Sequence, residues 1–331
     1  MKTVIAAAAR PLPAPLLLPL LLPLLLPLLA ATGCAWFADA PREPPPAFAG
    51  RAPDLTGRRE APPRFFAFGD FGTGGAGQRR VAAGLAARAR AASPDFLVLL
   101  GDHFYPDGVD SVDDPQWRTK FEEPYADAAL QVACYAVLGN HDHRGRPQAQ
   151  LDYAAAHPRF VLPAPWYVFS VALPGGGKAD FFALDTTQLL EATPLAEAQL
   201  DWLATALGAS TARWQIVLGH HPVRSSADRG LAAYRQRLEP ILRGHGVDLG
   251  LFGHDHFSQW LAPEDGLHVA IAGGGGGSDN ESRPRPSLEV VWSATGGGFA
   301  DVTLDAAKIV VEFADADGAT ARRFEITGGD R

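Results

Sequence analysis

An alternation of short apolar runs with helical stretches constrains the fold of this chain more than any other feature of its sequence. Seven apolar runs each end in a polar or glycine cluster: "RFFAFGD", "FLVLLGD", "YAVLGNHD", "FFALDT", "WQIVLGHH", "VDLGLFGHDH" and "LHVAIAGG". Helical stretches lie among them, at Gln78–Ala92, Pro115–Ala126, Pro194–Leu207 and Leu231–His245. This pattern predicts an α/β fold in which helices cover a buried sheet, with the polar clusters along the C-terminal edge of its strands.

The chain closes with a different pattern. Residues 290–327 alternate apolar and polar side chains, with turn signals at Asp305 and at Asp317-Gly318, which predicts an antiparallel β meander. With 331 residues, 47% of them apolar, the chain is long enough to bury a full core. We expect residues 64–328 to form a single domain.

The charge of the chain argues against a nucleic-acid partner. Its formal net charge is −8, and its basic residues form no cluster beyond short pairs such as Arg79-Arg80. A nucleic-acid backbone needs a basic face, so we expect a small substrate instead. We also expect the protein to be a monomer.

The N-terminal segment has the composition of a targeting signal. Residues 1–33 combine Lys2 and Arg10 with a long apolar run, and they end in small residues before Cys34. Prolines recur every four residues in the run, which is unfavourable for a transmembrane helix. The ending resembles a bacterial lipoprotein signal, which implies lipid on Cys34, membrane anchoring outside the cytoplasm (periplasmic or at the cell surface) and a proline-rich tether over residues 34–63. A retained membrane anchor and ordinary secretion are the alternatives.

Five of the predicted strand ends carry residues of the types that bind metals. They are Asp70, Asp102 with Tyr105, Asn140 with His141, His220, and His254 with His256. A single such cluster is typical of a solvated turn, but five in succession indicate a metal site. Carboxylates, imidazoles, an amide oxygen and a phenol suit hard or borderline cations better than soft ones.

These motifs resemble those of the binuclear metallophosphoesterases, and among them the purple acid phosphatases of the small, tartrate-resistant type. The resemblance also includes "DGVDSVDDPQW", "PAPWYVFSV", "LDTTQL", "AEAQLDWLATAL", "HHPVRS" and "GGGFADV". It implies an αββα sandwich of two mixed sheets flanked by helices, with the meander at its C-terminal end.

The resemblance also implies a ligand set for two metal ions. The first metal is held by Asp70, Asp102, Tyr105 and His256, and the second by Asp102, Asn140, His220 and His254. Most metallophosphoesterases begin with Asp-x-His, whose histidine binds the first metal, but Gly72 stands in that place here. Tyr105 replaces the missing ligand, and a phenolate favours Fe(III) at the first site. Fe(II), Zn or Mn is expected at the second.

The implied activity is hydrolysis of phosphate monoesters by a metal-bound or metal-bridging hydroxide, without a phosphoenzyme. Besides the bridging Asp102, the catalytic candidates are His141, Arg229 and His221. In the family, the histidine at position 141 contacts phosphate or assists the leaving group. Arg229 stands where small members carry a second histidine, and arginine holds phosphate but donates no proton, since its pKa exceeds about 12. His141, or else His221 or Asp228, would then protonate the leaving group.

Two other activities are compatible with these motifs. One is phosphodiesterase or nucleotide pyrophosphatase activity on the same scaffold. The other is a non-catalytic lipoprotein that binds phosphate or metal. A glycine run at Gly273–Gly277 has no following helix of the kind that nucleotide loops have, and we expect a mobile loop there.

Overall fold

The computed structural model describes residues 49–57, 59–227, 231–277, 283–285, 287 and 289–328. The predicted targeting segment 1–33, Cys34 and residues 35–48 lie outside the described residues. Within the described part of the chain, no helix is both long enough and apolar enough to cross a membrane.

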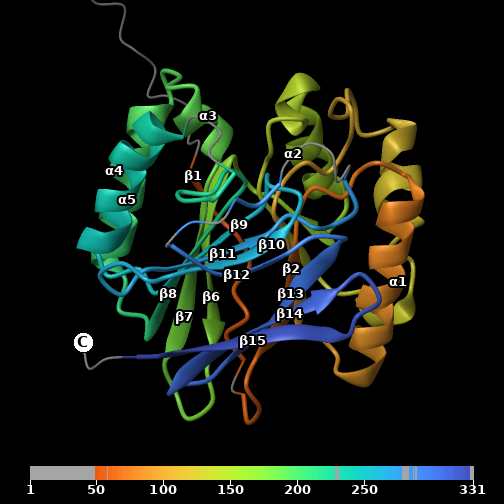
Figure 1. Cartoon of the computed structure of the whole chain (residues 1–331). Coiled ribbons are helices and arrows are strands. Elements are labelled where there is room, and N and C mark those ends of the chain that lie inside the picture. The colour runs from red at the N-terminus through yellow and green to blue at the C-terminus, as the bar shows by residue number, and fades with distance from the viewer. Residues whose placement is uncertain are drawn as a thin grey trace, which may run out of the picture. The chain divides into compact units, whose positions relative to one another are not determined.

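The described strands form two mixed sheets, which confirms the expected α/β sandwich (Figure 1). In spatial order, the first sheet contains β1 (Ala49–Arg51), β6 (Trp166–Ala172), β7 (Lys178–Ala183), β8 (Trp214–Gly219), β9 (Leu249–Phe252), β11 (His268–Ala272), β10 (Ser258–Leu261) and β12 (Val290–Ala294). The neighbours β7, β8, β9 and β11 run parallel, whereas β10 and β12 pair antiparallel at one edge.

The predicted meander over residues 290–327 is wrong for its first part, because Val290–Ala294 form β12 and pair with β10 in the first sheet. The second sheet combines a parallel half with the rest of the predicted meander. Its strands are β15 (Thr320–Thr327), β14 (Lys308–Asp315), β13 (Gly298–Leu304), β2 (Arg64–Phe68), β3 (Phe96–Leu99), β4 (Cys134–Ala136) and β5 (Phe160–Val161). The strands from β2 to β5 are parallel, and β13 joins the meander to β2 in antiparallel register. The sequence from β13 onward therefore extends the sheet that begins at β2.

Helices cover the outer faces of both sheets. They are α1 (Ala76–Ala91), α2 (Pro147–Ala156), α3 (Thr186–Leu190), α4 (Ala196–Ala209) and α5 (Ala232–Gly244), with short 3₁₀ turns η2 (Ala128–Leu130) and η3 (Asp142–Arg144). In Figure 1, α4 and α5 lie beside the first sheet and α1 lies beside the second. The buried Leu200, Leu203 and Leu207 form the apolar stripe of α4, as expected for a helix that covers a sheet.

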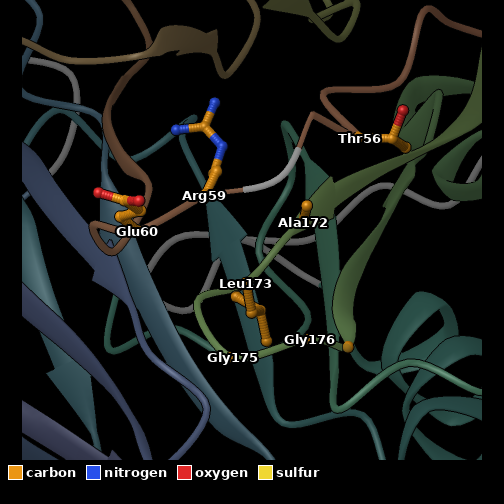
Figure 2. A pocket seen from close by; sticks show the side chains of 8 residues that line it. Thr56, Arg59, Glu60, Ala172, Leu173, Gly175 and Gly176 are labelled. Atoms are coloured by element: carbon orange, nitrogen blue, oxygen red, sulfur yellow. The ribbon is translucent and has the colours of Figure 1, made fainter.

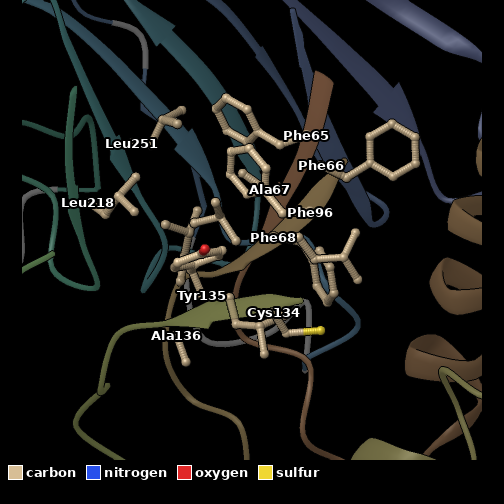
Figure 3. Close-up of a cluster of buried hydrophobic side chains, with 14 of the residues drawn as sticks. Phe65, Phe66, Ala67, Phe68, Phe96, Cys134, Tyr135, Ala136, Leu218 and Leu251 are labelled. Carbon is tan, nitrogen blue, oxygen red and sulfur yellow. The ribbon is translucent and has the colours of Figure 1, made fainter. Parts of the chain in front are cut away.

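The core follows from the alternation of side chains along the strands. Phe65 on β2 meets Phe181 on β7 across the two sheets, with ring centroids 5.5 Å apart. Figure 3 shows Phe65 in the same buried cluster as Leu218 of β8 and Leu251 of β9. The next residue on β7, Phe182, faces the opposite way and packs in the cluster that contains Leu203 of α4, because successive strand residues point to opposite faces. Burying each such ring stabilises the fold by about 1.5–3 kcal/mol.

Three expectations need correction. The predicted tether 34–63 overlaps the domain, because residues 49–51 form β1 and pair in parallel with β6. The helix expected at Pro115–Ala126 is present but ends at Glu122, and most of it is the π-helical segment η1 (Trp117–Glu122). Finally, α2 and α3 were not expected from the sequence, because one has little amphipathic pattern and the other has only five residues.

Candidate metal centre

The ligand-type residues that the sequence singles out come together at one rim of the two sheets. Asp70 follows β2, Asp102 and Tyr105 follow β3, Asn140 and His141 follow β4, His220 follows β8, and His254 and His256 follow β9. The first three of these strands belong to one sheet, and β8 and β9 belong to the other. The expectation of a single sheet edge is therefore wrong, and the centre lies where the strand ends of both sheets meet.

A first group of donor atoms surrounds the hydroxyl of Tyr105. This oxygen lies 2.9 Å from Asp102 Oδ2, 3.2 Å from Asp70 Oδ1 and 3.1 Å from His256 Nε2. His256 Nε2 is in turn 3.5 Å from Asp70 Oδ1. Two carboxylates, a phenol and an imidazole thus converge on one point, which is a donor set that suits a hard cation.

A second group shares Asp102 with the first. Asn140 Oδ1 lies 3.1 Å from His220 Nε2 and 3.1 Å from His254 Nδ1, and His220 Nε2 lies 3.4 Å from Asp102 Oδ2. His220 Nδ1 donates a hydrogen bond of 2.8 Å to the carbonyl of Leu100. This bond leaves the lone pair of Nε2 facing the centre, as in histidines that bind metals.

The electrostatics of the pocket favour a positive charge at its centre. Burial and the charges of Asp70 and Asp102 raise the pKa of Tyr105 well above its usual value, so a phenolate forms there only beside a cation. Burial lowers the pKa of His220, but the charges of Asp102 and Asp70 outweigh burial and raise it to about 10. The residues present therefore fit a pair of metal ions.

The backbone is strained at the metal centre. Asp70, Asp102 and His254 adopt φ values of 60°, 53° and 68°, in the left-handed region that side chains disfavour. Such conformations cost about 1–3 kcal/mol each and persist where the surrounding structure holds them. The strain therefore lies at three of the residues that could hold metals.

Gly72 stands where no side chain fits. A Cβ atom at this position would lie 1.9 Å from the carbonyl oxygen of His103. The segment that carries Tyr105 is also bonded directly to Gly72, since Gly72 N–H donates to Asp102 O at 3.3 Å and Tyr105 N–H donates to Gly72 O at 2.8 Å. The same close packing that excludes a side chain at position 72 thus brings the phenol of Tyr105 into the centre.

The glycine run Gly273–Gly277, expected as a mobile loop, is instead packed behind the first group. Gly275 N–H donates to Gly69 O at 2.9 Å, and Gly277 N–H donates to Asp70 O at 2.6 Å. A Cβ atom on Gly273 would lie 2.1 Å from the carbonyl oxygen of Asp255. Bare backbone is required here because the loops that carry Asp70 and His256 occupy the space.

His141 borders both groups. Its Nε2 lies 4.0 Å from Asp102 Oδ2, and its Nδ1 lies 2.5 Å from the carbonyl of Pro106 and 3.1 Å from Arg144 Nη1. Nδ1 cannot both donate to the carbonyl of Pro106 and accept from Arg144. Because the contact with the carbonyl is the shorter of the two, the proton lies on Nδ1. Nε2 is then the ring atom that faces the centre.

His221 lies beside the second group. Its ring centroid is 4.4 Å from that of His254, and one of its ring nitrogens lies within 4.8 Å of nitrogens of His220 and His254. Thr186 Oγ1 accepts from the backbone N–H groups of His220 (3.1 Å) and His221 (2.8 Å), so its proton is left to donate to His221 Nδ1 (3.1 Å). The ring proton of His221 then lies on Nε2. Arg229 lies outside the described residues.

Asp185 and His143 form an ion pair near this rim that sequence reasoning missed. His143 Nε2 lies 2.9 Å from Asp185 Oδ2, and Gln199 holds the backbone of Asp185 through hydrogen bonds of 2.9 and 3.1 Å. Burial lowers the pKa of His143, but the hydrogen bond and charge of Asp185 outweigh burial and raise it above 6.5. The "LDT" sequence after β7 was the available signal.

This pair predicts a pH-dependent contribution to stability. Because the folded-state pKa of His143 is raised, the pair contributes fully below the unfolded value of about 6.5, and its contribution is lost as pH rises through the folded value. His143→Gln keeps a neutral hydrogen-bonding group and removes the charge. We expect urea unfolding of the metal-free chain to show a larger loss of stability in this variant at pH 6 than at pH 9. Equal losses at both pH values would contradict a charged pair.

A cavity of about 730 Å³ lies away from the metal centre, between the segment before β2 and the β6–β7 turn (Figure 2). Thr56, Arg59 and Glu60 line one side of it, and Leu173 and the glycines of the turn line the other. Arg59 pairs with Asp95 at 2.6 Å. The β6–β7 turn precedes β7, whereas the metal centre lies beyond the opposite ends of the strands, so this cavity is separate from the ligand groups.

Comparisons with known proteins agree with this geometry. A family profile described as "Calcineurin-like phosphoesterase" matches residues 63–258, which include both ligand groups. Tartrate-resistant acid phosphatase type 5 of Homo sapiens is 32% identical over 248 residues, covering 68% of this chain and 76% of the human protein. Purple acid phosphatase 7 of Arabidopsis thaliana is 28% identical over 284 residues, covering 80% and 85%.

Among solved structures, "GAP50 the anchor in the inner membrane complex of Plasmodium" superposes with a TM-score of 0.76. The alignment covers 82% of this chain and 90% of that one, at 24% sequence identity. A likeness at this level of identity shows a shared fold.

Proposed function

Since this chain belongs to the calcineurin-like phosphoesterase family, among the purple acid phosphatases, we propose that it hydrolyses small phosphate monoesters at a ferric and divalent metal pair. The observation that carries the ferric assignment is the position of the Tyr105 hydroxyl, 2.9–3.2 Å from donor atoms of Asp70, Asp102 and His256. A phenolate is a hard anionic donor, and hard donors favour hard cations.

The two groups of donor atoms support the following assignment. Asp70, Asp102, Tyr105 and His256 would hold Fe(III), while Asp102, Asn140, His220 and His254 would hold Fe(II), Zn or Mn. When bound, the metal pair supplies positive charge to the phosphate and lowers the pKa of the water that attacks it. Asp102, shared by both groups, fixes their separation. We expect direct attack of water on phosphorus, with no phosphoenzyme.

The remaining residues would act on the substrate. His141 directs Nε2 toward the centre at 4.0 Å from Asp102 Oδ2, where it would contact the phosphate or the leaving oxygen. His221, held by Thr186, lies next to the second group. Arg229, from its place in the sequence, would add positive charge for phosphate but no proton.

A visible spectrum and metal analysis of the purified chain test this proposal. We expect two metal ions per chain and a charge-transfer band that gives a purple colour. Tyr105→Phe removes the phenolate and abolishes the band. Tyr135→Phe is the matched control, because the hydroxyl of Tyr135 donates to Pro53 O at 2.7 Å within the core, and its loss leaves the band in place.

Two results would contradict the proposal. If the purified enzyme bound two metal ions and were fully active but colourless, Tyr105 would not bind Fe(III) as a phenolate. Faster hydrolysis of a bis-aryl phosphate than of the matching mono-aryl phosphate would favour the phosphodiesterase alternative.

A further inference from the structure

Asp142 is a buried carboxylate whose hydrogen-bonding capacity is fully used within the protein. Its Oδ1 accepts from His103 N–H at 3.0 Å and from Gln150 Nε2 at 2.9 Å. Its Oδ2 accepts from Asp102 N–H at 2.9 Å and from Gly139 N–H at 2.8 Å. A carboxylate offers about four acceptor positions, so no lone pair remains for a metal ion or a substrate.

The donors to Asp142 come from three separate segments. Asp102 and His103 follow β3, Gly139 immediately precedes Asn140 after β4, and Gln150 lies on α2. The carboxylate therefore ties the loop that carries the shared residue Asp102 to the loop that carries Asn140. It also helps to hold Asp102 in its left-handed conformation, with a φ of 53°.

A second contact fixes the orientation of this cluster. Gln150 uses its amide nitrogen for Asp142, so its Oε1 faces His103 Nδ1 at 2.8 Å and the ring proton of His103 lies on Nδ1. His103 itself is fully buried. The side chain of Gln150 thus prevents the carboxylate from rotating away from the backbone groups.

From this geometry we infer that Asp142 is a positioning residue that sets the separation of Asp102 and Asn140, and thereby the affinity of the second metal site. The inference rests on the ligand assignment proposed above. Asn140 contributes to the second site alone, so release of its loop weakens that site more than the first. Tyr105 of the first site has its own anchor in the hydrogen bond from its N–H to Gly72 O.

The test is the affinity of the full chain for Zn²⁺, measured by competition with a chromophoric chelator. Asp142→Asn replaces one acceptor oxygen by an NH₂ group, which then faces two donors. Residues that orient metal ligands typically contribute a factor of about 10–100 in metal affinity, and we expect the second Zn²⁺ to bind more weakly by this factor. The first Zn²⁺ should lose less affinity than the second, because Asn140 belongs to the second group alone.

Asp180→Asn is the matched control for a general loss of stability. Asp180 is also a buried carboxylate, and it accepts from Ser170 Oγ, Lys178 Nζ and Ser210 Oγ at 2.6–2.9 Å. It lies near the start of β7, at the end of the strand away from the metal centre. We expect this variant to unfold at a lower temperature while it keeps the wild-type affinity for both Zn²⁺ ions.

Three results would overturn the inference. One is wild-type affinity for the second Zn²⁺ in Asp142→Asn, and another is an equal loss of affinity in Asp180→Asn. If Asp142→Asn does not fold, the variant Gln150→Ala takes its place, since it removes one of the four donors to Asp142. We expect Gln150→Ala to weaken binding of the second Zn²⁺ to a smaller extent. Unchanged affinity for the second Zn²⁺ in Gln150→Ala is the third result that would overturn the inference. A wild-type chain that binds fewer than two Zn²⁺ ions would instead contradict the proposed metal centre.

Discussion

Replacing Asp102 by Ala should remove both metal ions and lower kcat by at least ~10⁴-fold, because this residue is the one that the two groups of donor atoms share. Metal ions lower the pKa of bound water to about 7, so loss of the pair leaves water a much weaker nucleophile at neutral pH. The measurements are kcat for an aryl phosphate and the metal content after dialysis.

Asp107→Ala is the control for this experiment. Asp107 lies five residues further along the same loop and is exposed, so its loss should leave both metals and most of the activity. An Asp102→Ala variant that retained two metals and wild-type kcat would show that the shared carboxylate is not a ligand.

Replacing His141 by Ala should have an effect that depends on the leaving group. As a general acid, His141 would act in its imidazolium form, in which Nε2 carries a proton as well as Nδ1. General acid catalysis typically contributes a factor of about 10²–10⁴, and we expect a loss of kcat/KM in this range for alkyl phosphates. Esters of acidic phenols leave without a proton, so their loss should be much smaller. Arg229 cannot replace His141 as the proton donor, because a guanidinium keeps its proton in proteins.

The control for His141 is His157→Ala, which removes an exposed histidine whose ring stacks on Tyr153. This variant should keep the wild-type kcat/KM for both alkyl and aryl phosphates. An equal loss for alkyl and aryl esters in His141→Ala would assign His141 to phosphate binding and leave the proton donor to another group.

The strands and the ligand residues could be predicted from the sequence because both have local signals. Continuous apolar runs mark β2, β3 and β8, and each is followed by Asp or His within three residues. The division of the strands into two sheets has no such local signal. A buried parallel strand has the same apolar run and the same polar C-terminal end in either sheet. Only the resemblance to the family implied it.

The role of Asp142 also could not be read from the sequence. Its partners are mainly backbone N–H groups, which every residue other than proline possesses. The same limit applies to Gly273–Gly277, whose composition is typical of a mobile loop, although the loops around Asp70 and Asp255 fill the space beside it. Packing against distant segments decides such positions.

The close contact between Gly72 and the backbone of His103 has an evolutionary consequence. A histidine introduced at position 72 would collide with that backbone, and the loss of Tyr105 alone would leave the first site without one of its donors. The site can have either a tyrosine at position 105 or a histidine at position 72 as its ligand. Either single substitution on the way from the first version to the second would damage the enzyme. A change from the tyrosine version to a histidine at position 72 would therefore require the loop around His103 to be remodelled in the same step.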